Sequence, residues 1–122
     1  MNDCPYILQN LFENLVYCGV KPYYLFQLDE VSGAMHFKVK VQKGIDIMRF
    51  LRKNVSGLAL PYYVFDIPGG FGKVPVDYRY MKKRKADNIY LEGFSGTTGT
   101  YCDDGKESRC MECGLCKDSL RV

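Results

Sequence analysis

Residues 61–73, PYYVFDIPGGFGK, join an apolar segment to a glycine-rich turn that ends in a lysine. The apolar part ends at Asp66. An earlier segment of the same form, PYYLFQLD at residues 22–29, ends at Asp29. Segments that are apolar on both faces are typical of strands in a parallel sheet covered by helices. We therefore expect two neighbouring parallel strands whose carboxyl ends carry the two aspartates.

The segments before and between these strands have the periodicity of amphipathic helices. Residues 3–18 form one such segment: Asp3 can cap its start, Pro5 suits the first turn, and Gly19 can stop it. Residues 41–53 form the second. The apolar stripes consist of Ile7, Leu8, Leu11, Phe12, Leu15 and Val16 in the first segment and Ile45, Met48 and Leu51 in the second. Alternating helices and strands predict an α/β fold.

Length and composition are those of a globular chain. The chain has 122 residues, of which 47% are hydrophobic and 25% charged, so it can form one modest domain with a core. Its net charge of +3 is too small to indicate a nucleic-acid partner, and we expect the basic run at residues 82–85 to be a solvated loop. No signal peptide or transmembrane run is visible, so we expect a cytoplasmic protein without a membrane partner.

Asp29 and Asp66 lie where α/β proteins place their functional sites, at the carboxyl ends of strands. An aspartate after a strand can also be a helix cap or a turn residue. Neither of these aspartates is followed directly by a helical pattern. Two carboxylates at matching ends of successive strands are consistent both with one shared pocket and with turn residues, so both interpretations stay open here.

The glycine-rich turn before Lys73 resembles a phosphate-binding P-loop only superficially. A P-loop has four residues between its glycines and a Ser or Thr after its lysine. Only two residues separate Gly69 from Gly72, and Lys73 precedes Val-Pro-Val, which starts no helix. A lysine near carboxylates in a partly dry pocket instead suits carbonyl chemistry through a Schiff base. The alternative is an exposed lysine after a turn.

Cysteine spacing indicates a metal site. The six cysteines are Cys4, Cys18, Cys102, Cys110, Cys113 and Cys116, and in a cytoplasmic protein they are expected to be thiols or ligands. The last three form a C-x-x-C-x-x-C run, which leaves a tetrahedral zinc site one ligand short. An iron–sulfur cluster is the alternative, although the missing Cys-Pro favours zinc. Cys18 is expected to pack in the core.

Five motifs follow one another in the order of one known family: NDC (2–4), KPYYLFQLD (21–29), HFKVKVQKGIDIMRFLR (36–52), SGLALPYYVFDIPGGFGKVPV (56–76) and EGFSGTTGTY (92–101). Together they resemble the C-terminal part of lysine 2,3-aminomutase, a radical-SAM enzyme that also uses pyridoxal phosphate. The resemblance extends over about residues 2–116. Its most specific element is the Asp-x-Pro-Gly-Gly-x-Gly-Lys sequence that ends at Lys73.

The resemblance implies roles for three residues. Lys73 matches the lysine that forms the internal aldimine with pyridoxal phosphate. Asp29 and Asp66 match the acidic residues that hold the side-chain ammonium of substrate lysine, whereas a glutamate substrate would need a basic or neutral group there. Phe71 stands where the family usually has a glycine, which leaves the conformation of this loop open.

The resemblance also implies a structural zinc ion. In the family, a C-terminal cysteine trio binds zinc together with a cysteine from a neighbouring subunit, which lies in an Asn-Asp-Cys context. By this match Cys4, Cys110, Cys113 and Cys116 are the ligands, and zinc holds a homo-oligomer together. The family spacing is C-x-C-x-x-C, so the first cysteine of the trio differs here, and Cys102 is an alternative ligand.

The radical-SAM motif C-x-x-x-C-x-x-C, whose thiolates hold the [4Fe-4S] cluster that binds S-adenosylmethionine, does not occur in the sequence. The resemblance therefore implies the last βα units of a partial (β/α) radical-SAM barrel in residues 1–76. A C-terminal extension with a cysteine metal site then occupies residues 77–122. We expect a segment of a lysine 2,3-aminomutase that is inactive without a complementary N-terminal half. The alternative is a non-catalytic metal-binding or assembly module.

Overall fold

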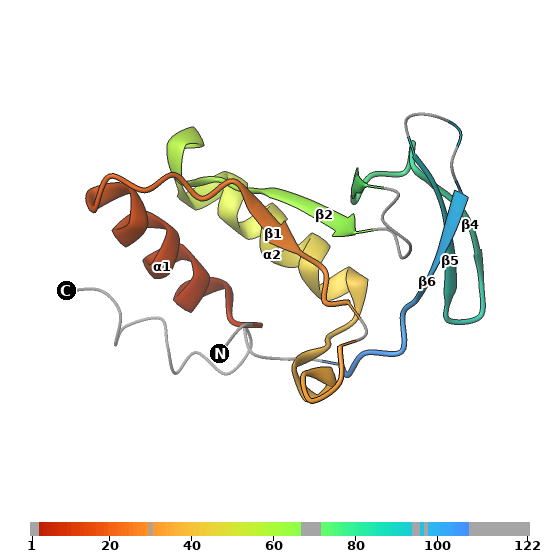
Figure 1. Ribbon diagram of the computed structural model, residues 1–122. Helices are drawn as coiled ribbons and strands as arrows, with labels where there is room; N and C mark the ends of the chain where they lie inside the picture. The colour runs from red at the N-terminus through yellow and green to blue at the C-terminus, as the bar shows by residue number, and fades with distance from the viewer. Residues whose placement is uncertain (1–2, 30, 67–71, 94–95, 97, 108–122) are drawn as a thin grey trace.

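The computed structural model describes residues 3–29, 31–66, 72–93, 96 and 98–107. Two helices and two small three-stranded sheets make up this part of the chain (Figure 1). In chain order the elements are α1 (Pro5–Tyr17), β1 (Tyr24–Phe26), α2 (Val41–Asn54), β2 (Tyr62–Asp66), β3 (Lys73–Pro75), β4 (Met81–Lys85), β5 (Asn88–Glu92) and β6 (Thr98–Cys102). Short 3-10 turns occur at Met35–Phe37 and Gly57–Ala59. The predicted α/β class is confirmed, while the partial barrel stays a prediction.

The first sheet has the order β1-β2-β3. Strands β1 and β2 are parallel, with Tyr24 opposite Tyr62, as the sequence predicted. Strand β3 is antiparallel to β2 and was not predicted. The predicted first strand over residues 22–29 is shorter in the structure, because only Tyr24–Phe26 keep the extended ladder with β2.

Both helices lie beside the first sheet, with α2 behind β1 and β2 (Figure 1). Their apolar stripes and one face of β2 form a core of Leu8, Phe12, Ile47, Met48, Leu51, Ala59 and Tyr63. Tyr24, Phe26 and Tyr62 project from the other face and are 50%, 46% and 69% exposed. The expectation that both faces of these strands are buried is therefore wrong for β1 and for the start of β2, whereas Val64, on the same face of β2 as Tyr62, is buried.

The predicted helix boundaries are close to the observed ones. Helix α1 begins with Pro5 in its first turn, and the chain leaves it through Gly19, whose φ of 81° suits a residue without a Cβ. Its N-cap residue is Cys4 rather than Asp3. Helix α2 spans Val41–Asn54, one residue longer than predicted.

The second sheet is antiparallel and has the order β4-β5-β6. The basic run at residues 82–85 belongs to strand β4, so the predicted loop is wrong, although these side chains are exposed as expected. A second core joins the two sheets and the start of α2 through Val41, Phe65, Val74, Ile89, Leu91 and Tyr101. The predicted division between residues 76 and 77 stays a prediction.

The cysteines differ in exposure. Cys4 is fully buried, Cys102 is half-buried, and Cys18 is exposed. The prediction that Cys18 packs in the core is wrong, because α1 ends at Tyr17 and Cys18 is the residue that follows its last turn. No helix in the described residues is both long and apolar enough to span a bilayer.

Candidate functional site

The fold brings Asp29, Asp66 and Lys73 to one edge of the first sheet. Asp66 is the last residue of β2 and Lys73 the first residue of β3, and the two are direct partners in the antiparallel ladder. Asp29 follows β1, which is parallel to β2, so both strands deliver their aspartates to the same edge. The expected meeting of the two strand ends is confirmed.

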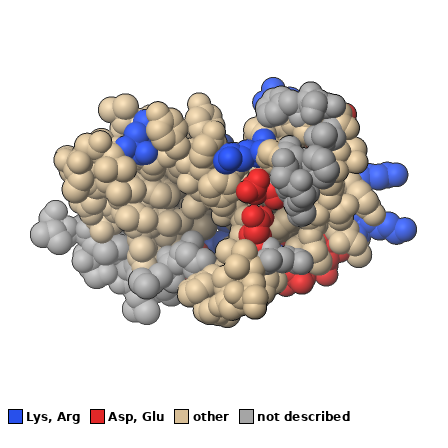
Figure 2. Space-filling model, in the orientation of Figure 1, with Lys and Arg blue, Asp and Glu red and all other residues tan. Residues whose placement is uncertain are grey.

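The two carboxylates interact electrostatically. Burial raises the pKa of Asp29 above its usual range, and the negative charge of Asp66 raises it further. In Figure 2 acidic side chains gather near the middle of the visible face, directly below a basic side chain. A cation held between the two carboxylates would stabilise their ionised forms and so offset both the cost of burial and the repulsion that act on Asp29.

Lys73 lies over aromatic side chains of β1. Its Nζ is 5.7 Å from the ring centroid of Tyr24 and 6.0 Å from that of Phe26. The two rings are themselves 5.8 Å apart, and the lysine is exposed. The partly dry pocket expected around Lys73 is therefore not formed by the residues that the structure describes. The aromatic surface and the amine together suit a planar ring with a carbonyl group, which fits pyridoxal phosphate.

A buried hydrogen-bond network, which the sequence analysis missed, ends at the carbonyl of Leu28, the residue that precedes Asp29. The Tyr63 hydroxyl donates to Gln27 Oε1 at 2.5 Å, and Gln27 Nε2 donates to the Tyr101 hydroxyl at 2.9 Å. Tyr101 in turn donates to the Leu28 carbonyl at 2.8 Å. Gln27, a polar residue in an otherwise apolar strand segment, was the one signal that could have indicated it.

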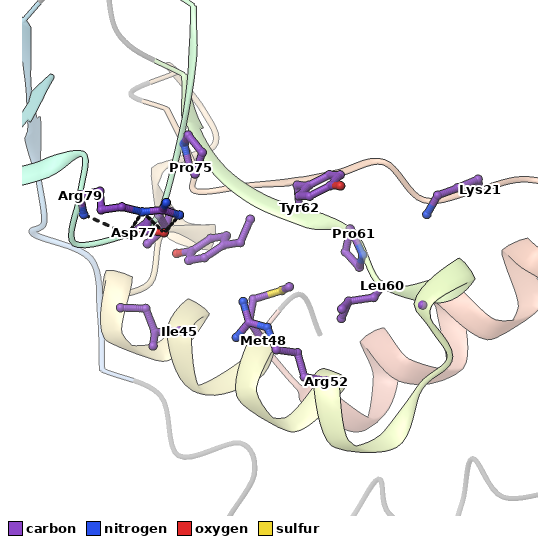
Figure 3. A pocket seen from close by; sticks show the side chains of 13 residues that line it. Lys21, Ile45, Met48, Arg52, Leu60, Pro61, Tyr62, Pro75, Asp77 and Arg79 are labelled. Atoms are coloured by element: carbon purple, nitrogen blue, oxygen red, sulfur yellow. Dashed lines mark hydrogen bonds and ion pairs between the residues drawn. The ribbon is translucent and has the colours of Figure 1, made fainter. Parts of the chain in front are cut away.

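A cavity of about 560 Å³ lies away from these residues, between α2, the start of β2 and the chain that follows β3. Figure 3 shows Arg52 and Met48 of α2 on one wall, and Asp77 bound to Arg79 at one end. Arg79 donates to the Asp77 carboxylate at 2.8 Å and lowers the pKa of that carboxyl. Asp29, Asp66 and Lys73 are not among the residues that line this cavity.

The predicted metal ligands are only partly covered by the structure. Cys4 is buried at the start of α1. Cys110, Cys113 and Cys116 lie outside the described residues. Within residues 3–29, 31–66, 72–93, 96 and 98–107, no three His, Cys, Asp or Glu side chains form a group that could hold a metal ion.

Comparison with known proteins identifies amino-acid 2,3-aminomutases as relatives of the chain. A family model described as Lysine-2,3-aminomutase matches residues 48–119, which is more than half of the chain. The chain is 38% identical to an L-lysine 2,3-aminomutase of Methanococcus maripaludis over 95% of its own length and 27% of the relative. It is 36% identical to the L-lysine 2,3-aminomutase of Clostridium subterminale over 100% of its length and 29% of the relative.

A further relative carries a different name. The chain is 35% identical to a Glutamate 2,3-aminomutase of Clostridioides difficile over 79% of its length and 23% of the relative. The chain thus spans less than a third of the length of these relatives. The family model and the relatives confirm the resemblance that the motifs indicated: the chain belongs to the lysine 2,3-aminomutase family.

Proposed function

We propose that this chain supplies the substrate-ammonium site and the cofactor lysine of a lysine 2,3-aminomutase, an isomerase that interconverts L-lysine and β-lysine. The observation that carries the proposal is the placement of two carboxylates and an amine at one sheet edge. Asp66 faces Lys73 across the β2–β3 ladder, and the charge of Asp66 acts on Asp29.

The aspartate pair is suited to a primary ammonium group. Hydrogen bonds between an ammonium and a carboxylate are about twice as strong as neutral ones, and two carboxylates can share one cation. Because burial and the Asp66 charge destabilise the ionised form of Asp29, a bound cation gains interaction energy there. The same pair would repel the side-chain carboxylate of glutamate. Two aspartates therefore favour lysine over glutamate as the substrate.

Lys73 is proposed to bind pyridoxal phosphate covalently through its amine. When bound, this cofactor supplies a carbonyl carbon that joins to amino groups and a conjugated ring that delocalises charge and unpaired electrons. Tyr24 and Phe26 would offer a flat surface beside Lys73 on which such a ring can lie. S-adenosylmethionine and its [4Fe-4S] cluster are expected in the intact enzyme, bound by residues that this chain does not supply.

Zinc is proposed as a structural ion bound by Cys4, Cys110, Cys113 and Cys116. Four thiolates are a donor set typical of structural zinc, and their binding energy adds to folding or assembly energy. Cys4 is buried at the start of α1, which fits a structural ligand better than a reactive thiol. The alternative function is a non-catalytic metal-binding or assembly module. Such a module would keep the zinc site, but Asp29 and Asp66 would bind no ligand.

Ligand discrimination tests the proposed ammonium site. The ligands are L-lysine and L-norleucine, which has the same carbon chain without the terminal ammonium, and the protein is the complete enzyme loaded with pyridoxal phosphate. Both aspartates are half-buried without a ligand, and we expect bound substrate to complete their burial. Asp29→Asn and Asp66→Asn are then each expected to weaken lysine binding by about 2 to 5 kcal/mol, as when one partner of a charge pair that is buried in the complex is lost. Norleucine binding should stay unchanged.

Asp46→Asn is the matched control, because Asp46 is a half-exposed acid on α2 that takes part only in local contacts, with Gln42 at 3.0 Å and Arg49 at 3.6 Å. It should bind both ligands as the wild type does. If both site variants keep the wild-type preference for lysine over norleucine, the two aspartates are turn residues and the proposal fails.

A further inference from the structure

The hydrogen-bonded triad of Gln27, Tyr63 and Tyr101 lies between the two sheets and ends at the peptide group that precedes Asp29. We propose that this triad is a positioning device that orients Asp29 toward Asp66 and thereby sets the specificity of the site for a primary ammonium group. The inference rests on the proposed function of the two aspartates.

The regular ladder of β1 stops before Asp29. The strand ends at Phe26, and the next backbone hydrogen bond to β2 runs from the Gln27 N–H to the Val64 carbonyl at 2.9 Å. Beyond it, the Tyr101 hydroxyl donates to the Leu28 carbonyl at 2.8 Å. Because the Leu28 carbonyl belongs to the peptide plane that ends at the nitrogen of Asp29, this bond fixes the plane from which the Asp29 side chain projects.

Tyr101 reaches this point from the second sheet. It lies in β6, its ring packs against Phe65 of β2 at a centroid distance of 5.1 Å, and the Lys38 ammonium lies 4.8 Å from its centroid. The ring is thus held independently of its hydroxyl. Removal of the hydroxyl alone would leave this packing in place and delete the bond to Leu28.

Gln27 orients the hydroxyl of Tyr101. Its amide donates both to that hydroxyl at 2.9 Å and to the Val39 carbonyl at 2.8 Å, and it is only 4% exposed. Since the Tyr101 oxygen already accepts a hydrogen bond from Gln27, its own hydrogen is directed to the Leu28 carbonyl.

Tyr63 orients Gln27 in turn. Its hydroxyl donates to Gln27 Oε1, which leaves the amide nitrogen of Gln27 facing Tyr101. Burial, together with Tyr101 and Asp103, raises the pKa of Tyr63, so its hydroxyl keeps the proton that it donates. Gly44 of α2 leaves the space for this hydroxyl, because a Cβ there would overlap it. Each hydrogen bond of the triad therefore has a defined donor and a defined acceptor.

A network that only stabilised the core would affect all ligands alike. A network that orients Asp29 affects the ligand that carries an ammonium group and leaves its ammonium-free analogue unchanged. The ratio of the two affinities therefore separates positioning from general stability.

Tyr101→Phe in the complete enzyme loaded with pyridoxal phosphate is the direct test. We expect about a fivefold to tenfold loss of L-lysine affinity, the size of one hydrogen bond, with unchanged L-norleucine affinity. Tyr63→Phe is expected to act in the same direction with a smaller effect, and it decides the matter if Tyr101→Phe does not fold. Tyr90→Phe on β5 is the matched control, since Tyr90 is 40% exposed, and it should change neither affinity.

Asp29→Asn measured beside these variants separates the two hypotheses. If Asp29→Asn lowers the lysine-to-norleucine ratio and both tyrosine variants keep it, the positioning inference is wrong and the ammonium site stands. Equal weakening of both ligands in the tyrosine variants would also overturn the inference, since it indicates a structural role. If Asp29→Asn itself keeps the wild-type ratio, the proposed function fails, and the inference fails with it.

Discussion

The ionised carboxylate of Asp29 lowers the stability of the folded protein. Burial disfavours its charge first, and the neighbouring charge of Asp66 adds to that cost. Both effects are expected of a site that is completed by a cation. The residue is therefore less favourable for the folded chain alone than a neutral side chain of the same shape.

The pH dependence of stability tests this property of Asp29. Its folded pKa is raised, so its contribution is fully present below the ordinary carboxyl pKa and is lost as pH rises through the folded value. Asp29→Asn does not titrate. Relative to wild type, this variant should gain stability between pH 3 and pH 7, by less than about 1 kcal/mol because solvent screens a partly exposed carboxylate.

Urea denaturation of both proteins across this pH range, without substrate, is the measurement. Asp46→Asn, which removes a half-exposed acid from α2, is the matched control and should not reproduce this gain. A variant–wild-type difference for Asp29→Asn that is independent of pH, or that moves the other way, would contradict a raised pKa at this position.

Sequence could indicate Asp29, Asp66 and Lys73, because each sits at a fixed place relative to an apolar strand or a glycine turn. It could not indicate the triad of Gln27, Tyr63 and Tyr101 that ends next to Asp29. Tyr101 is one of ten tyrosines, and it meets Gln27 only because β6 packs against the first sheet. Contacts between residues that are 74 positions apart leave no local pattern.

Among the elements, α2 is the one that connects the two sheets, and its first turn depends on a residue from far along the chain. The backbone N–H of Val41 donates to Asp103 Oδ1 at 2.9 Å, and Arg84 of β4 binds the other oxygen at 2.9 Å. Asp103 is 1% exposed. It thus supplies the acceptor that a local N-cap side chain would usually provide.

Asp103→Ala should therefore destabilise the protein by about 2 to 3 kcal/mol, because it leaves a buried donor and a cation without their acceptor. Asp103→Asn keeps an oxygen for Val41 and should cost less. Asp87→Ala is the control, since Asp87 is 60% exposed and lies 3.5 Å from Lys40. Urea denaturation measures the stability of all three variants. Equal stability of Asp103→Ala and Asp87→Ala would show that the contacts of Asp103 with Val41 and Arg84 do not stabilise the protein.

Helices were more predictable than strands. The apolar stripes of α1 and α2 and the stop at Gly19 are local signals, and the predicted ends agree closely with the structure. Strand β4 was missed because its side chains are a run of charges, which indicates exposure but not extended backbone. Its conformation comes from pairing with β5, which is a non-local cause.

At the scale of the whole molecule, the first sheet has both helices beside it (Figure 1). Aromatic side chains are exposed on its other face. The second sheet closes one end through a shared core and supplies Tyr101. The chain spans less than a third of its relatives' length, and its own strands bring Asp29 and Asp66 to the same end of the first sheet.

Assembly through zinc is tested by Cys4→Ser. If the zinc ion joins Cys4 of one chain to Cys110, Cys113 and Cys116 of another, this variant should lose the metal and the dimer together, because zinc-binding energy is then assembly energy. Cys18→Ser is the matched control, since Cys18 is exposed at the end of α1. Sedimentation with parallel metal analysis gives both quantities. A dimeric Cys4→Ser protein with a full zinc content, or a wild-type protein that carries iron and sulfide, would contradict this assembly.

The cofactor lysine is the central claim, and one chemical measurement tests it most directly. The complete enzyme is loaded with pyridoxal phosphate, reduced with borohydride to make the attachment permanent, digested, and its labelled peptide is sequenced. The amine of Lys73, next to Tyr24 and opposite Asp66, is expected to carry the pyridoxyl group. A pyridoxyl group on Lys43 or Lys53 of α2, with Lys73 unmodified, would contradict the assignment of the site.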